Sequence, residues 1–138
     1  MRMTLLLSAA ALAIAACGSD APTRSDYRAI VNDRCERLLA RTVELADEHF
    51  GDLEEAPTEQ QTQEYAEEAV AMQREVLDQL RDRPVPEGDE ETLEQLYSAW
   101  GDALDAAAED LESADARAAA DDFRQRAEDY GVSECAGL

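Results

Sequence analysis

The feature that most constrains the fold of this chain is a set of apolar stripes with helical spacing. In four separate runs, apolar residues recur every three or four positions, which places them on one face of an α-helix. The first stripe consists of Tyr27, Ile30, Val31, Cys35, Leu38, Leu39, Thr42, Leu45, Ala46 and His49. No stretch shows the alternation of apolar and polar residues that is typical of a half-buried strand. The pattern predicts an all-α protein.

Caps and breakers divide the four runs. Ser25 is a candidate N-cap for the first helix, and the segment 51–57 ends it. Thr58 and Gln61 have the spacing of a capping box at the start of the second helix. Prolines at positions 84 and 86 cannot belong to a helix interior, so the segment 83–88 predicts a linker.

The third and fourth runs follow this linker. The third carries Leu93, Leu96, Tyr97, Trp100, Leu104, Ala107 and Leu111, and the fourth carries Ala116, Ala119, Ala120, Phe123, Ala127 and Tyr130. Ser113 is the candidate cap between them, and Gly131 followed by Val132 predicts a Schellman-type end. The simplest arrangement is an antiparallel up-down four-helix bundle. The alternative is a three-helix arrangement in which the third and fourth helices are fused.

The N-terminus has the pattern of a bacterial lipoprotein signal. Arg2 and an apolar run over 3–13 precede Ile14-Ala15-Ala16-Cys17, in which small residues stand before a cysteine that can accept a diacylglyceryl group. The apolar run is too short to span a membrane, which needs about 20 residues. An ordinary secretory signal without lipidation is the alternative.

These observations predict three parts. They are a lipoprotein signal peptide at 1–16, a lipidated cysteine and tether at 17–24, and a helical domain at 25–138. The mature protein then carries palmitate-type acyl chains on Cys17 and is anchored to the extracytoplasmic face of the cell membrane.

The net charge of −21 limits the choice of partners. So acidic a chain is repelled by nucleic acid, and we expect no nucleic-acid partner. Between Glu87 and Asp115 there are eleven acidic residues and no basic one. This segment is interpreted as a solvated acidic face; a docking surface for a basic partner or for divalent cations is the alternative.

Lipidation of Cys17 would leave two cysteines, Cys35 and Cys135, in an oxidising compartment. They are the obligatory partners of any intramolecular disulfide. Two buried free thiols are the alternative. In the up-down bundle a short tail after Gly131 would bring Cys135 to the level of Cys35, so the spacing and the disulfide agree.

The sequence contains no recognisable catalytic or metal-binding pattern. His49 is the single histidine, it lacks the Glu-x-x-His partner of di-iron bundles, and no second histidine is present to share a zinc ion. We therefore expect no enzymatic activity, no cofactor and no metal. Tyr97 and Trp100 are weak candidates for ligand binding, although residues on a helical stripe usually belong to the core.

The chain resembles small actinobacterial cell-envelope lipoproteins. The resemblance rests on the order of the lipobox, a tyrosine-led helix with an internal cysteine (Tyr27 to Leu38), the Pro84-x-Pro86 linker and a closing segment from Tyr130 to Cys135. It implies a helical bundle with a disulfide between Cys35 and Cys135. It carries no catalytic residues, because most of those proteins have no assigned function.

Together these observations predict a non-catalytic extracytoplasmic lipoprotein that binds or scaffolds at the cell envelope. Its expected partners are the membrane, through the lipid anchor, and an envelope protein. The alternative is a binding module for a small ligand or a divalent cation, with a pocket between helices. The sequence does not specify the oligomeric state.

Overall fold

The computed structural model describes residues 21–51 and 56–138. These residues form four α-helices, one short 3-10 helix and no strand. The helices are α1 (Arg24–Phe50), α2 (Glu59–Arg81), α3 (Glu90–Glu109) and α4 (Ala114–Tyr130), followed by the 3-10 helix η1 (Cys135–Gly137). The predicted all-α fold is confirmed. The predicted signal peptide at 1–16 and the predicted lipidation site Cys17 lie outside the described residues.

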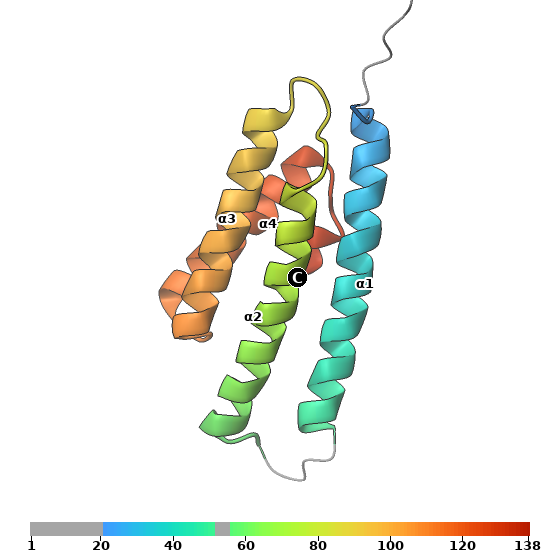
Figure 1. The fold of residues 1–138 in the computed structure, drawn as a ribbon. Coiled ribbons are helices and arrows are strands. Elements are labelled where there is room, and N and C mark those ends of the chain that lie inside the picture. Colours follow the sequence, from blue (N-terminus) through green and yellow to red (C-terminus); the bar gives the residue numbers. More distant parts are fainter. Residues whose placement is uncertain (1–20, 52–55) are drawn as a thin grey trace, which may run out of the picture.

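The helices form an antiparallel bundle in which each helix packs against the next one along the chain (Figure 1). Helices α1 and α2 run side by side, α3 lies on the other side of α2, and α4 lies behind. The segment 110–113 separates α3 from α4, because Asp110 has an extended backbone (φ −160°, ψ 102°). The four-helix arrangement is therefore the observed one, and the fused alternative does not occur.

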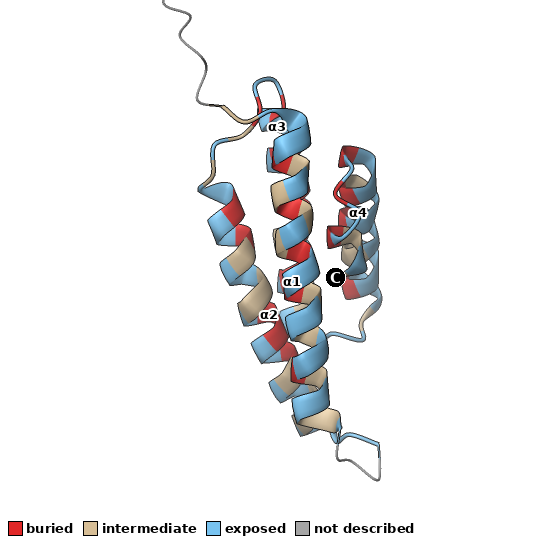
Figure 2. Ribbon diagram, turned by 90° about the vertical axis from the view of Figure 1, so that its right-hand side faces the viewer, coloured by how far each residue is buried: buried red, intermediate tan, exposed pale blue. Residues whose placement is uncertain are grey.

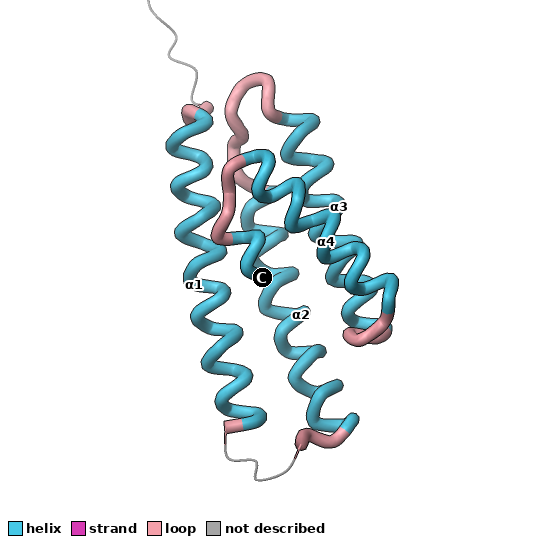
Figure 3. The backbone as a smooth tube through the Cα atoms, turned by 180° about the vertical axis from the view of Figure 1, so that it is seen from behind, coloured by secondary structure: helices cyan, strands magenta, loops and turns pink. Residues whose placement is uncertain are grey.

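Helix α4 is oblique to the other three. Seen from behind, it runs towards the upper half of α1 (Figure 3). Helix α4 packs against α3 and η1, and η1 packs against α1. The C-terminal tail therefore closes the bundle between its last and first helices.

Local side-chain caps set the starts of α1, α2 and α4. Thr58 and Gln61 form the predicted capping box, and Ser113 Oγ accepts a hydrogen bond from the N–H of Ala116 at 3.0 Å. Gly131 ends α4 in the left-handed region (φ 89°), and the Val132 N–H reaches back to the Ala127 carbonyl at 2.8 Å. This is the predicted Schellman end.

Two predicted boundaries were wrong. Thr23, and not Ser25, caps α1, because the extended backbone of Thr23 lets its Oγ1 accept from the N–H of Asp26 at 3.1 Å. The α1 helix consequently begins at Arg24, within the segment predicted as tether. Leu111, predicted to lie on the third stripe, follows the end of α3 and is 42% exposed.

The apolar stripes meet in one core, and Figure 2 colours the buried residues red along the helices. Its large and fully enclosed side chains include Trp100, Tyr27, Leu80, Leu93, Val31 and Val132. Trp100 stacks on Phe123 of α4 with ring centroids 5.1 Å apart. Burial of each such side chain stabilises the fold by roughly 1.5 to 3 kcal/mol, so this core holds α3 and α4 together.

A disulfide between Cys35 and Cys135 fixes the tail to α1. The two Cα atoms are 4.9 Å apart, and both residues are buried. Asn32 supports the same junction, because its side-chain oxygen accepts a hydrogen bond from the N–H of Glu134 at 3.1 Å. The disulfide predicted from the two cysteines is present in the structure.

Candidate functional site

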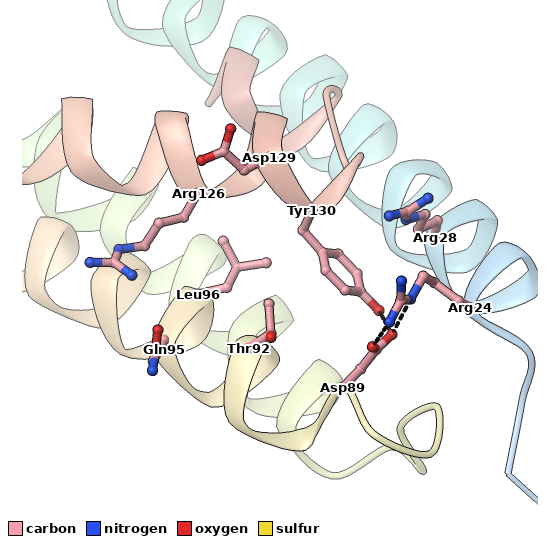
Figure 4. Close-up of a pocket in the computed structure, with 9 residues that line it drawn as sticks. All are labelled: Arg24, Arg28, Asp89, Thr92, Gln95, Leu96, Arg126, Asp129 and Tyr130. Atoms are coloured by element: carbon pink, nitrogen blue, oxygen red, sulfur yellow. Dashed lines mark hydrogen bonds and ion pairs between the residues drawn. The ribbon is translucent and has the colours of Figure 1, made fainter.

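A cluster of buried polar and charged side chains lies at the end of the bundle where α1 begins. The up-down topology brings four segments together here: the start of α1, the linker before α3, the start of α3 and the end of α4. Three of the four tyrosines and the one buried charged residue of the described part meet at this end. Figure 4 shows Asp89 with Arg24 and Tyr130.

Asp89 is the centre of this group. Its side chain is 2% exposed, whereas that of its partner Arg24 is 56% exposed. The Nε of Arg24 donates to Oδ2 of Asp89 at 2.7 Å, and a terminal nitrogen of Arg24 donates to the other carboxylate oxygen. The hydroxyl of Tyr130 donates to Oδ2 at 2.9 Å. Asp89 is thus a buried carboxylate whose two oxygens are both occupied.

The hydrogen bond from Arg24 lowers the pKa of Asp89 below its usual value, and it outweighs the opposite effect of burial. The hydrogen bond from Tyr130 and the charges of Arg24 and Arg28 act in the same direction. Asp89 is therefore charged at neutral pH and is neutralised by Arg24. It is not poised to exchange a proton near pH 7.

A tyrosine pair lies beside this ion pair. The hydroxyl oxygens of Tyr27 and Tyr97 are 2.7 Å apart and share a hydrogen bond within the core. Burial raises the pKa of both hydroxyls, and of Tyr130 as well. All three tyrosines are accordingly neutral hydrogen-bonding groups rather than bases.

Arg28 occupies a different environment from Arg24. Its guanidinium carbon lies 5.1 Å from the centroid of the Tyr130 ring, a cation–π distance. Its Nε is buried and has no hydrogen-bond partner. Within residues 21–51 and 56–138, Arg28 forms no ion pair. Arg28 therefore stacks on Tyr130 without a direct ion pair, although its charge acts on the nearby Asp89 carboxylate.

A cavity of about 290 Å³ opens over this group, between α3 and α4. Its lining consists of Arg24, Arg28, Asp89, Thr92, Gln95, Leu96, Arg126, Asp129 and Tyr130 (Figure 4). The volume suits a small polar ligand or a single chemical group of a larger one. We define this cavity as the anchor-end cavity, because it lies at the end of the bundle where α1 begins, next to the segment predicted as the tether.

The two residues predicted from the sequence as weak ligand contacts occupy different places. Tyr97 lines a second cavity of about 420 Å³ together with Arg81, Val85, Glu90, Leu93, Glu94 and Ser98. Trp100 is 1% exposed, and its Nε1 donates to the side-chain oxygen of Gln73 at 3.0 Å. The structure brings Tyr97 to a cavity wall and places Trp100 in the core.

His49 lies at the opposite end of the bundle. It contacts the rings of Phe50 and Tyr65, and its Nε2 is 3.3 Å from a carboxylate oxygen of Glu68. Among the described side chains, no three His, Cys, Asp or Glu residues are close enough to hold a metal ion. A helix with the length and hydropathy of a membrane span was likewise not found in the same residues.

Sequence reasoning missed the group around Asp89. Arg24 was assigned to the tether, and Asp89 to an acidic face exposed to solvent. One clue was available, because an up-down bundle places the chain before the first helix, the linker 83–88 and the end of the fourth helix at one end. A carboxylate, an arginine and a tyrosine in those segments are therefore neighbours by topology.

Comparison of the chain with models of known protein families, with curated protein sequences and with solved structures found no match. The interpretation of the site therefore depends on the residues and geometry described above.

Proposed function

We propose that this protein is a lipid-anchored extracytoplasmic lipoprotein of the bacterial cell envelope that acts by binding rather than by catalysis. The lipobox ending at Cys17 motivates the anchor. The bundle then stands close to the membrane, because the eight residues from Cys17 to Arg24 extend over about 25 Å at most between their first and last Cα atoms.

The observation that carries the extracytoplasmic part of the proposal is the Cys35–Cys135 disulfide. Structural disulfides form and persist in oxidising compartments and are rare in the cytosol. This one joins the tail to α1 within the core, where both sulfurs are shielded from reductants. Its position supports export of the chain independently of the N-terminal pattern.

The binding part of the proposal rests on the anchor-end cavity. The Asp89 carboxylate, neutralised by Arg24, and the neutral hydroxyl of Tyr130 form part of its wall, and Arg28 lies next to them without an ion pair. Rigid polar walls of this kind position a ligand without reacting with it. We assign the cavity to recognition of a ligand or of a group on an envelope protein.

Two variants of the full chain, expressed in a lipoprotein-processing bacterium, test the anchor. Cys17→Ser should abolish labelling by a fatty-acid analogue and leave the protein as a precursor or release it from the membrane fraction. Ser19→Ala, a change close to the cleavage site that leaves the lipobox intact, is the matched control. Unchanged lipid labelling of the Cys17→Ser variant would contradict the proposal.

A second candidate function is a small-ligand module built on the cavity beside Tyr97. The observation that favours it is the placement of Tyr97 in the wall of the 420 Å³ cavity, one helical turn before the single tryptophan. A change in tryptophan fluorescence with envelope metabolites or divalent cations, lost in Tyr97→Phe, would support it. Unchanged fluorescence with every compound would count against it.

A further inference from the structure

The anchor-end cavity contains one arginine, Arg28, whose buried Nε has no hydrogen-bond partner. Arg24 donates to both carboxylate oxygens of Asp89, and the Nε of Arg126 donates to Asp122 at 2.9 Å. Arg28 has neither kind of partner among the described residues. Four other described arginines likewise form no ion pair, but among the described side chains Arg28 alone has a buried polar atom without a hydrogen-bond partner.

The position of Arg28 is fixed by its neighbours. The Tyr130 ring lies under the guanidinium, and Gly131 follows directly with a left-handed backbone. A Cβ atom at position 131 would stand 3.1 Å from both Cζ and Nε of Arg28, so any other residue would force the guanidinium to shift by a few tenths of an ångström. These contacts restrict the side chain before any ligand arrives, which lowers the entropic cost of binding.

The chemistry of a fixed, unpaired guanidinium points to an oxyanion. Its planar fork matches a carboxylate or a phosphate with two parallel hydrogen bonds. Thr92 and Gln95, which line the same cavity from α3, offer further donors (Figure 4). The net charge of −21 repels multiply charged anions, so a group with a single charge fits best.

We propose that the anchor-end cavity binds a singly charged oxyanion, a carboxylate or a phosphodiester, through the guanidinium of Arg28. This inference rests on the proposed function, which assigns the cavity to ligand recognition, and it adds the chemical class of the ligand. Two sources offer the same group: the phosphodiester of a membrane lipid headgroup close to the tether, and a soluble envelope compound.

The test uses the full chain in a neutral sugar-based detergent and follows the arginine Nε–Hε signals by NMR. Acetate and dimethyl phosphate are added at constant ionic strength, with chloride as the reference. The Arg28 signal should shift and saturate. Arg28→Gln should weaken binding, read from neighbouring backbone amides, by about tenfold or more. Arg117→Gln removes the same charge at the far end of α4 and should leave binding unchanged.

Transfer of the protein into phosphatidylglycerol nanodiscs distinguishes the two sources. An Arg28 signal already shifted before any soluble probe is added supports a lipid headgroup. A signal that shifts only with dimethyl phosphate or acetate supports a soluble ligand.

The proposal is overturned if neither probe nor nanodiscs produce a saturating shift, if chloride gives the same shift, or if Arg28→Gln still binds. If Arg28→Gln fails to fold, two other observations test the proposal. Probe binding must still shift the Arg28 signal of the wild-type protein, and it must be weaker in Thr92→Val. The outcome is independent of the anchor test. Oxyanion binding without lipid labelling would remove the lipoprotein proposal alone, and lipid labelling without oxyanion binding would remove this inference alone.

Discussion

Asp89 stands at the N-cap position of α3, yet its carboxylate bonds to Tyr130 at the end of α4, with 2.9 Å between the two oxygens. An aspartate at an N-cap usually accepts from the first N–H groups of its own helix. Here it does not, because Arg24 and Tyr130 occupy its oxygens. One carboxylate thus connects the starts of α1 and α3 with the end of α4.

Replacing this carboxylate should destabilise the whole bundle. Asp89→Asn removes the negative partner of Arg24 and weakens the bond to Tyr130, and we expect unfolding to be easier by roughly 1 to 3 kcal/mol. Asp105→Asn is the matched control, since the Asp105 carboxylate pairs with Arg74 on the exposed surface. Chemical denaturation measures both variants. Equal losses of stability in Asp89→Asn and Asp105→Asn would show that the buried ion pair of Asp89 stabilises the fold no more than an exposed one.

The same carboxylate predicts a pH dependence. The pKa of Asp89 is lower in the folded state than the unfolded value of about 3.9, so the unfolded chain takes up the proton first as the pH falls. The stabilisation by Asp89 is therefore complete above about pH 4 and is lost as the pH falls towards the folded pKa. The stability difference between wild type and Asp89→Asn should shrink in that acid range. A difference that grows below pH 4 would contradict the assigned direction.

The buried tyrosines should make the protein less stable at alkaline pH, whereas Asp89 makes it less stable at acid pH. The folded-state pKa values of Tyr27, Tyr97 and Tyr130 are raised above the unfolded value of about 10. Their contribution to the free energy of unfolding is complete below pH 10 and is lost as the pH rises further.

The hydrogen bond between Tyr27 and Tyr97 can be tested by mutation. In Tyr97→Phe, the Tyr27 hydroxyl loses its buried partner, and we expect the free energy of unfolding to fall by about 1 to 2 kcal/mol. The double variant Tyr27→Phe/Tyr97→Phe should recover part of this lost stability, because no hydroxyl is then left buried without a partner. A double variant with no recovery would contradict an energetic coupling between the two hydroxyls.

Alanine substitutions at two glycines distinguish the effect of side-chain packing from the effect of backbone strain. Gly131 (φ 89°) and Gly88 (φ 85°) both lie in the left-handed region, so either Gly→Ala change carries a backbone cost of about 1 to 2 kcal/mol. A Cβ at Gly88 meets nothing within 4 Å, whereas one at Gly131 meets the guanidinium of Arg28. Gly131→Ala should therefore lower the melting temperature more than Gly88→Ala, and it should also shift the NMR signal of Arg28.

Equal melting temperatures in the two glycine variants, with the Arg28 signal unmoved, would show that Arg28 is not packed against Gly131 in solution.

Loss of the disulfide should loosen the tail and the junction with α1. The bond closes a loop with a sequence separation of 100 residues, for which the chain-entropy account gives about 4 to 5 kcal/mol. Cys35→Ala/Cys135→Ala should lose a similar or smaller amount of stability. Hydrogen exchange should accelerate first in the segment 131–138 and in the facing turns of α1. Exchange that accelerates evenly over all helices would contradict the role of the tail as the closing element.

Much of this fold was accessible from the sequence. The apolar stripes predict four helices because burial of one face dominates helix stability, and the capping box at Thr58 and the end at Gly131 are local signals that need no tertiary context. The boundary at Thr23 was missed because Thr23 and Ser25 are equally good caps by residue type, and the backbone conformation decides between them.

The site was less accessible, because its residues derive their roles from tertiary contacts. Asp89 lies in an acidic segment, and nothing local distinguishes it from its exposed neighbours. Only the approach of Arg24 and Tyr130 from opposite ends of the chain makes its burial favourable. Arg28 is similar, since its unpaired state depends on Tyr130 and Gly131, about 100 residues away in sequence.

The most direct test of the account is mass spectrometry of the protein isolated from membranes under non-reducing conditions. We predict an N-terminal peptide that begins at Cys17 and carries a diacylglyceryl group, together with a linked peptide pair containing Cys35 and Cys135. An unmodified Cys17 with free thiols at Cys35 and Cys135 would contradict the proposal of an exported, lipid-anchored, disulfide-closed bundle.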